Sequence, residues 1–206
     1  MTAPPPAPDS ERHVDLTHAD EILHHHTKLP QTAVSRVLDG FLTVVGKAAS
    51  WLWLAVVGVI IYSVVGRYAF GQGSVTLEEW TWHLAGAGWL LGLAYTLSVD
   101  DHVRVDVFHE RMSLKTQAWV ELFGIVVLLL PFLGAALYEM VPYAMHAFEQ
   151  GERSQAPAGL ANRWILKSIL AVSFALLIIG AVSRLLRVTA LLFGLPRPLP
   201  AKAGAR

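Results

Sequence analysis

The densest group of residues that could do chemistry lies in one short segment between two apolar stretches. This segment holds eight titratable side chains, interleaved with valines: Asp100, Asp101, His102, Arg104, Asp106, His109, Glu110 and Arg111. Imidazole and carboxylate groups such as those of His102, Asp106 and His109 can ligate a divalent cation. The arginines in the same segment would repel that cation, so the pattern favours a solvated loop with ion pairs over a metal site.

Two further histidines allow a second kind of chemistry, which is haem ligation. Four helices of suitable length can hold a haem between two imidazoles, and His83 and His146 are the only plausible pair. His146 follows Pro142 and lies beyond an apolar run, so the two ligands would have to meet at the edge of a membrane. The chain has no cysteine, which excludes disulfides, thiolate catalysis and dithiol redox chemistry within it.

An acidic pair stands at the start of the second apolar stretch. The segment Thr76-Leu77-Glu78-Glu79 matches a capping box, with Thr76 as the N-cap, Glu79 at the third helical position and Val75 placed to pack on Trp80. In this interpretation Glu79 serves its own helix. Glu78 is then freer to pair with a basic group on a partner, although it also favours the helix N-terminus.

The elements that position these residues are four charge-free apolar runs, Ala48 to Gly66, Trp80 to Val99, Leu122 to Tyr138 and Ser168 to Ser183. A helix needs about 20 mostly apolar residues to cross a bilayer, and the shorter runs reach that length if Glu121, Lys167 and Arg184 extend their charges to the interface. A soluble four-helix bundle would need a polar face on each helix, and these runs have none. We therefore predict an all-α membrane protein with transmembrane helices at about 48–66, 77–99, 117–141 and 165–193.

Short flanking segments complete the predicted domain organisation. Residues 1–32 are predicted to be a disordered, polar, His- and Pro-rich tail, 33–195 the four-helix membrane domain, and 196–206 a short basic tail. Val34, Val37, Leu38, Phe41, Leu42 and Val45 recur at helical spacing, opposite Ser35, Arg36, Asp39 and Lys47, which predicts an interfacial amphipathic helix before the first span. Lysine and arginine are concentrated in the two terminal segments and the middle loop, so both termini are expected in the cytoplasm.

The midplanes of the four predicted spans contain no Asp, Glu, Lys or Arg. Proteins that carry ions across a membrane normally place such groups near its midplane, so this chain is expected to be a scaffold rather than a transport path. An oligomeric channel would need pore-lining polar residues that the spans hardly supply. Gly88 and Gly92 form a small-residue stripe suited to close helix packing. The zero net charge argues against a nucleic acid as partner.

Several short motifs occur in an order that is familiar from one transporter family. They are Arg67-Tyr68-Ala69-Phe70, Glu78-Glu79, His102-Val103-Arg104-Val105-Asp106-Val107, Gly159-Leu160, Arg163-Trp164 and Lys167. Over about Val34 to Phe193 the chain resembles the small membrane subunit of tripartite ATP-independent periplasmic (TRAP) transporters. That family often has a GLP-x-RW motif before the fourth span, and here Ala161-Asn162 replaces the usual proline.

The resemblance implies an accessory subunit, without catalytic residues or a cofactor, in the inner membrane of a bacterium. It would bind and stabilise a large multi-span subunit, while a periplasmic binding protein delivers an organic acid and a sodium gradient drives its uptake. The positions that match the family are expected to fix helix ends or dock the large subunit, and they are Arg67, Glu78, Glu79, His102, Arg104 and Asp106. Arg163 and Trp164 are expected to anchor the periplasmic edge of the fourth span.

Overall fold

The computed structural model describes residues 29–71, 73–99, 112–197 and 199. Within these ranges the regular structure is entirely helical, and its elements are α2 (Ala33–Phe70), α3 (Val75–Val99), α5 (Leu114–Phe123), a π-helical segment (Gly124–Leu129), α6 (Leu130–Glu149) and α7 (Trp164–Phe193). The predicted 1–32 tail lies almost wholly outside the described residues, as does most of the predicted 196–206 tail.

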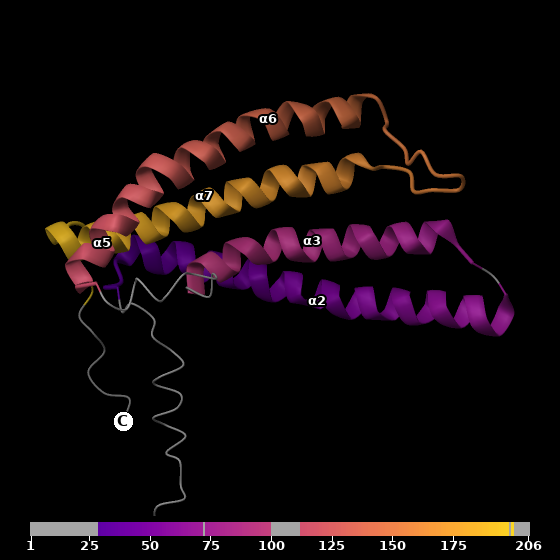
Figure 1. Ribbon diagram of the computed structural model, residues 1–206, viewed down its shortest axis with the longest axis horizontal. Coiled ribbons are helices and arrows are strands. Elements are labelled where there is room, and N and C mark those ends of the chain that lie inside the picture. Colours follow the sequence, from indigo (N-terminus) through magenta and orange to yellow (C-terminus); the bar gives the residue numbers. More distant parts are fainter. Residues whose placement is uncertain (1–28, 72, 100–111, 198, 200–206) are drawn as a thin grey trace, which may run out of the picture.

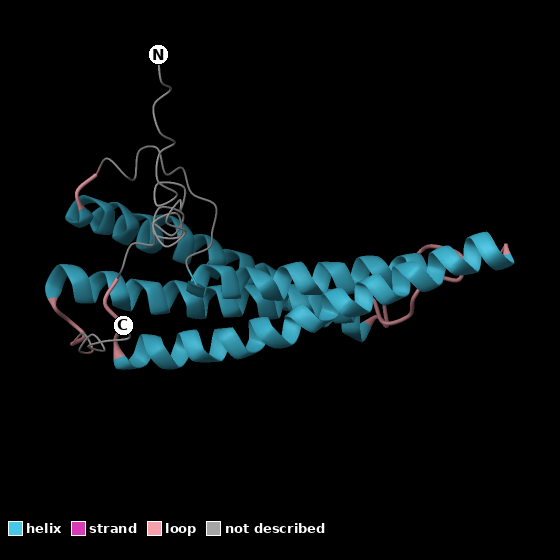
Figure 2. Cartoon of the chain, turned by 90° about the horizontal axis from the view of Figure 1, so that it is seen from below, coloured by secondary structure: helices cyan, strands magenta, loops and turns pink. Residues whose placement is uncertain are grey.

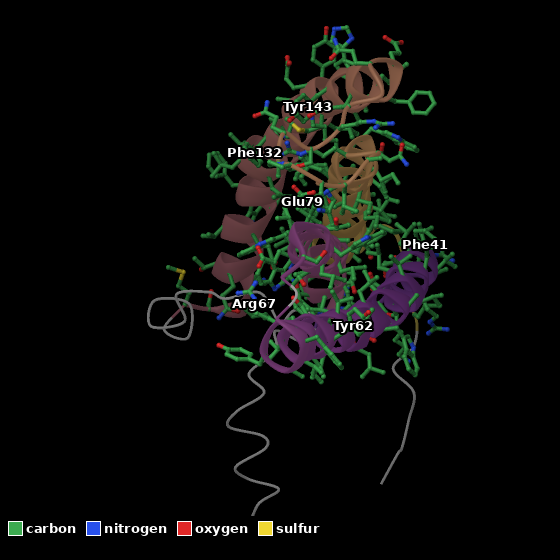
Figure 3. All side chains as sticks on the ribbon, turned by 90° about the vertical axis from the view of Figure 1, so that its right-hand side faces the viewer. Phe41, Tyr62, Arg67, Glu79, Phe132 and Tyr143 are labelled. Atoms are coloured by element: carbon green, nitrogen blue, oxygen red, sulfur yellow. The ribbon has the colours of Figure 1, made fainter. Side chains whose placement is uncertain are left out.

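The long helices form two antiparallel hairpins that lie side by side. α2 pairs with α3 and α6 pairs with α7, and the hairpins meet through α3 and α7. In both the side view and the end-on view, α6, α7, α3 and α2 follow one another in that order (Figures 1 and 3). The N-terminal part of α2 also contacts α7. The arrangement is therefore closer to a row of helices than to a closed bundle, with α2 and α6 as its outer members.

The predicted amphipathic segment and the first span form one continuous helix, α2, in which the segment leads directly into the span. α2 begins at a reciprocal cap, in which Ser35 N–H donates to Thr32 Oγ1 (3.1 Å) and Thr32 N–H donates to Ser35 Oγ (3.0 Å). It ends at Gly71, whose φ of 64° is the left-handed conformation typical of a helix C-cap. No proline interrupts the helix between these caps.

The face that α2 buries also differs from the amphipathic prediction. Ser35 and Leu42 are buried, whereas Val34 and Val37 of the expected apolar face are more than half exposed. Packing against α7 selects the small and polar side chains, because they allow the two backbones to approach and to exchange hydrogen bonds. Of the expected apolar face, Leu42 is buried against α3 and α7, whereas Val34, Val37 and Phe41 face outward.

The predicted third span bends where its backbone hydrogen bonding changes. Pro131 cannot donate to the carbonyl of Val127 four residues earlier, and the π-helical segment lies directly before it. α5 crosses the end of α7 before α6 turns to run along it (Figure 1).

Among the residues that the structure describes, three helical segments are long and apolar enough to cross a membrane, namely Ala33–Phe70, Leu114–Glu149 and Trp164–Phe193. α3, the expected second span, is not among them because Glu79, the tryptophans and His83 lower the hydropathy of its first half. Few side chains in these segments are fully buried. Large apolar side chains such as Val37, Leu54 and Phe132 are exposed on α2 and α6, whereas those of α7 are mostly half-buried. Exposed apolar surface of this extent suits contact with lipid or a membrane partner rather than water.

Glycines allow the closest approaches between helices. A Cβ on Gly46 of α2 would lie 2.5 Å from the Tyr95 ring of α3, and one on Gly88 would lie 3.4 Å from Trp53. Nothing lies within 4 Å of a Cβ on Gly92. The predicted Gly88 and Gly92 stripe thus packs within the chain only at Gly88, because the helix turns Gly92 away from α2.

Replacing Gly46 with alanine should lower the free energy of unfolding by about 1 to 2 kcal/mol, because the added methyl overlaps the Tyr95 ring. Gly92→Ala adds the same methyl in open space and is the matched control. Unfolding of the two purified variants in mild detergent measures the free energy of unfolding of each. Equal stability of the two variants would contradict the close α2 to α3 contact.

Candidate subunit-interface site

Four of the eight expected site residues, namely Arg67, Glu78, Glu79 and Arg163, lie around the start of α3, the end of α2 and the loop between α6 and α7. Arg67 and Glu79 are labelled in Figure 3. Arg67, in the last turn of α2, donates a hydrogen bond to Glu78, in the first turn of α3. The pair ties the two helix ends across the 71–74 turn. Both side chains are about half exposed, at 53% and 51%, so Glu78 has a partner within the chain and is still accessible from outside.

Replacing Arg67 or Glu78 with alanine should change the free energy of unfolding by less than about 1 kcal/mol, because exposed ion pairs are screened by solvent. The measurement is thermal unfolding in detergent. A loss above about 2 kcal/mol would mean that water does not reach the pair.

Glu79 holds the loop between α6 and α7, and the predicted capping box is wrong. Leu160 N–H donates to Glu79 Oε2 at 2.6 Å, and the Ser154 hydroxyl donates to Glu79 Oε1. Thr76 is not the cap either, since its hydroxyl donates to the Ala158 carbonyl at 2.6 Å. The helix begins at Val75, two residues before the predicted start at Leu77, and Ser74 Oγ accepts from Leu77 N–H at 3.4 Å. Glu79 and Thr76 thus join the start of α3 to the loop between α6 and α7.

The loop has the backbone geometry needed to present these groups. Ser154 N–H donates to the Leu160 carbonyl at 2.9 Å, which closes the loop opposite Glu79. A Cβ on Gly159 would lie 2.5 Å from Ser154 Cβ, so the closure requires glycine at this position. Ala158 and Asn162 have φ values of 60° and 63°, a strained region for residues with a side chain.

Aromatic and charged contacts fix the start of α7 against α6. Trp164 packs edge-on against Phe148, with ring centroids 4.9 Å apart. Lys167 pairs with Glu152 and also lies 4.0 Å from the centre of the Tyr143 ring. These contacts place Trp164 at the end of the α6 and α7 hairpin, where an anchoring residue was expected.

The remaining expected residues divide into one that the structure describes and three that it does not. Arg163 is the exposed N-cap residue of α7, and its positive charge lies close enough to attract Glu79. His102, Arg104 and Asp106 lie outside the described residues, as does His109 of the weighed metal site. The structure thus brings Arg67, Glu78, Glu79 and Arg163 into one region.

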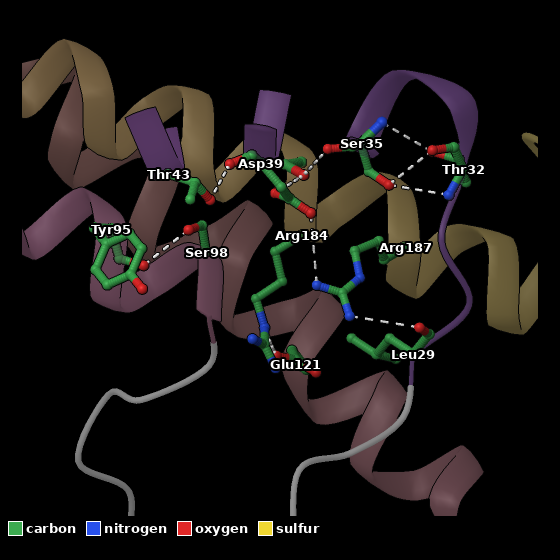
Figure 4. Close-up of polar contacts among 11 residues, drawn as sticks. Leu29, Thr32, Ser35, Asp39, Thr43, Tyr95, Ser98, Glu121, Arg184 and Arg187 are labelled. Carbon is green, nitrogen blue, oxygen red and sulfur yellow. Dashed lines mark hydrogen bonds and ion pairs between the residues drawn. The ribbon is translucent and has the colours of Figure 1, made fainter. Parts of the chain in front are cut away.

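A second polar cluster, at the opposite end of the helices, was missed by sequence reasoning (Figure 4). Arg184 of α7 pairs with Glu121 of α5, and their side chains are only 5% and 15% exposed. α5 crosses α7 and places the two groups together, so their charges pair with each other within the chain. Beside them, Asp39 accepts a hydrogen bond from Ser183 Oγ at 2.6 Å and lies 3.8 Å from Arg187.

A signal for this cluster was present in the sequence. Glu121 and Arg184 each end an otherwise charge-free run, and opposite charges at such positions can pair. Their separation of more than sixty residues hid the partnership. Asp39 was assigned to a solvated face, whereas it lies against α7.

The two histidines weighed as haem ligands have separate environments. His83 Nδ1 lies 2.8 Å from the Glu79 carbonyl of its own helix, and its Nε2 is buried without a hydrogen-bond partner. His146 is 75% exposed on α6 and lies 3.6 Å from Glu149. Nothing in these environments supports the haem-anchor alternative.

Comparison with known proteins identifies the family. No curated protein matches the chain. The family described as "Tripartite ATP-independent periplasmic transporters, DctQ component" matches residues 56–191, which include the clusters around Glu79 and Arg184. This family is a transporter component and not a known enzyme family. Since the match covers more than half of the sequence, the chain belongs to the DctQ family of small TRAP transporter membrane subunits.

Proposed function

We propose that this chain is an accessory subunit that binds and braces the large multi-span subunit of a TRAP transporter. In this proposal a periplasmic solute-binding protein delivers an organic acid and a sodium gradient drives its import. The observation that carries the proposal is the family match together with the row of helices, whose outer members α2 and α6 expose large apolar side chains. Such a row offers a broad apolar face for another membrane protein.

The distribution of charge supports a bracing role over a transport path within the chain. The described ion pairs gather towards the ends of the helices, where they join one element to another. Transport sites normally need ionisable groups or broken helices inside the membrane, exposed to a cavity. We therefore assign ion and solute binding to the large subunit.

We further propose the membrane arrangement in the bacterial inner membrane. α3 crosses with the three more apolar segments, which makes four spans, and both termini lie in the cytoplasm. Residues 1–32 and 196–206 are then cytoplasmic tails. The Glu79 cluster lies on the periplasmic side and the Arg184 cluster on the cytoplasmic side.

The accessible members of the site are the best candidates for docking the large subunit. Arg67 and Glu78 are half exposed, and Arg163 is exposed beside them. His102, Arg104 and Asp106 are proposed for the same role on the cytoplasmic side, on the strength of the family resemblance. Charge reversal at Glu78 would then lower transport without lowering membrane insertion.

The experiment is purification of the tagged chain from its native membranes in mild detergent, with mass spectrometry of the accompanying proteins and an absorption spectrum. Stoichiometric recovery of one large multi-span protein, with no Soret band, is expected. Recovery of the chain alone would contradict the bracing role. A haem spectrum would contradict the assignment of a subunit without a cofactor.

A further inference from the structure

Glu139 is a carboxylate in an unusual place, on the exposed side of α6, which is one of the two outer helices. It lies in α6, within the Leu114–Glu149 segment that is apolar enough to cross a membrane, and its side chain is exposed. The exposed large side chains around it are apolar or aromatic, namely Phe132, Tyr138, Val141, Tyr143 and Met145. A single charge surrounded in this way is costly in lipid unless another group compensates it.

Contacts with α7 show how deep Glu139 lies. Tyr143 is level with Lys167, which sits over its ring, and Leu133 packs in the same cluster as Ala181. At about 1.5 Å per residue, Glu139 is about 6 Å from the first level and about 9 Å from the second. The Lys167 level borders the charge-free run of α7 that spans residues 168–183, and the Ala181 level lies within that run. Glu139 thus lies directly after the charge-free run that ends at Tyr138, about one helical turn inside the level of Lys167, at the edge of the apolar zone.

The part of the chain that the structure describes offers Glu139 no cation. The four residues on each side of it in α6, positions 135 to 143, include no Lys, Arg or His. Lys167, the cation of the neighbouring helix, is already paired with Glu152. None of the ion pairs found among the described residues includes Glu139.

The surface beside Glu139 is hollowed. An open groove of about 840 Å³ runs along this face, lined by Gly134, Leu137, Tyr138, Glu139, Val141 and Pro142. Gly134 has nothing within 4 Å of the position of a Cβ, so another helix can approach closely here. The groove therefore has room for a side chain from a neighbouring membrane helix.

The groove also presents two hydrogen-bond acceptors. Pro142 lies inside α6 and has no N–H to donate to the carbonyl of Tyr138 four residues earlier. That carbonyl and the Glu139 carboxylate are adjacent in sequence. A side chain with several donors and a positive charge, such as arginine or lysine, complements both acceptors.

We propose that the Glu139 groove on α6 receives a lysine or arginine side chain from a membrane helix of the large subunit. This inference rests on the proposed function, because it specifies where and how the large subunit binds. The pair forms away from water, where loss of one member of a charge pair strongly weakens association. α6 is thus assigned as the docking edge of the row.

The test compares two carboxylates of the same helix. Glu139→Gln removes the charge with little change in shape, and Glu149→Gln does the same at the exposed end of α6, where Glu149 pairs with His146. Each tagged variant is purified from membranes containing the large subunit, and the ratio of large to small subunit is measured. We expect at least about a tenfold lower ratio for E139Q, with the E149Q ratio unchanged.

A photo-crosslinking residue at position 138 gives an independent readout, because Tyr138 lines the same groove and is 78% exposed. We expect it to label the large subunit next to a lysine or arginine. Exchanging the charges, with Glu139→Lys in this chain and a glutamate at the labelled cation, should restore the complex.

The outcomes separate this inference from the proposed function. Equal subunit ratios for E139Q and E149Q, or crosslinks only to lipid or to a second copy of this chain, would overturn the docking groove while leaving the bracing role intact. If the unmodified chain recovers no large subunit, both proposals fail.

Discussion

Replacing Arg184 with leucine is expected to lower the free energy of unfolding by about 3 to 5 kcal/mol. Arg184 and Glu121 are 5% and 15% exposed, so the substitution leaves a carboxylate in a site with little water to solvate it. Leaving a buried charge without a partner is far more costly than losing an exposed ion pair. Thermal or denaturant unfolding in mild detergent measures the effect.

The matched controls for Arg184→Leu separate the pair from the single charge. Arg153→Leu removes an exposed arginine from the loop between α6 and α7 and should leave stability nearly unchanged. The double variant of Arg184→Leu with Glu121→Leu should recover most of the loss, because apolar side chains can replace a buried ion pair. A double variant as unstable as Arg184→Leu alone would show that the pair is not the cause.

Replacing Glu79 with alanine should open the loop between α6 and α7. The carboxylate accepts from Leu160 N–H and from the Ser154 hydroxyl, so alanine removes two charge-assisted hydrogen bonds at once. Trypsin can report the opening, because Arg153 and Arg163 lie in the loop. Cleavage at Arg153 should become roughly a hundredfold faster, since the cleavage rate follows the open population and each lost bond contributes about a factor of ten.

The neighbouring carboxylate is the control for Glu79→Ala. Glu78→Ala removes the exposed pair with Arg67 but leaves both loop contacts in place, so its cleavage rate should match that of the unmodified chain. Glu79→Gln retains an acceptor for Leu160 N–H, so its cleavage rate should lie between those of Glu79→Ala and Glu78→Ala. Equally slow cleavage of Glu79→Ala and Glu78→Ala would contradict the role of Glu79 as the attachment point of the loop.

The all-helical fold could be predicted because each long apolar run records a local property of the chain. Three of the four expected spans correspond to segments that are apolar enough to cross a membrane. The boundary of α2 was harder to predict, since amphipathic spacing around Val34 resembles a separate interfacial helix. A capped helix without an internal proline continues through such a pattern, and packing on α3 and α7 decides which face is buried.

Sequence reasoning singled out several residues of the candidate site but did not predict the contacts that they make. Glu79 was identified as a functional candidate, but its sequence context matched a local capping box better than a bond to a loop eighty residues away. The Glu121 and Arg184 pair was missed for a related reason. Hydrogen bonds across large sequence separations depend on how helices cross, and no local pattern specifies that crossing.

The row of helices has a consequence for how freely the sequence can change. A layer one helix thick has little interior, so at many positions an isolated chain requires only that the side chain be apolar. Wherever such a position nevertheless rejects apolar replacements, something outside the chain must be in contact with it. Saturation mutagenesis scored by transport would therefore outline the area that the partner covers, and the tolerance map of α2 and α6 would reveal which edge of the row meets protein and which meets lipid.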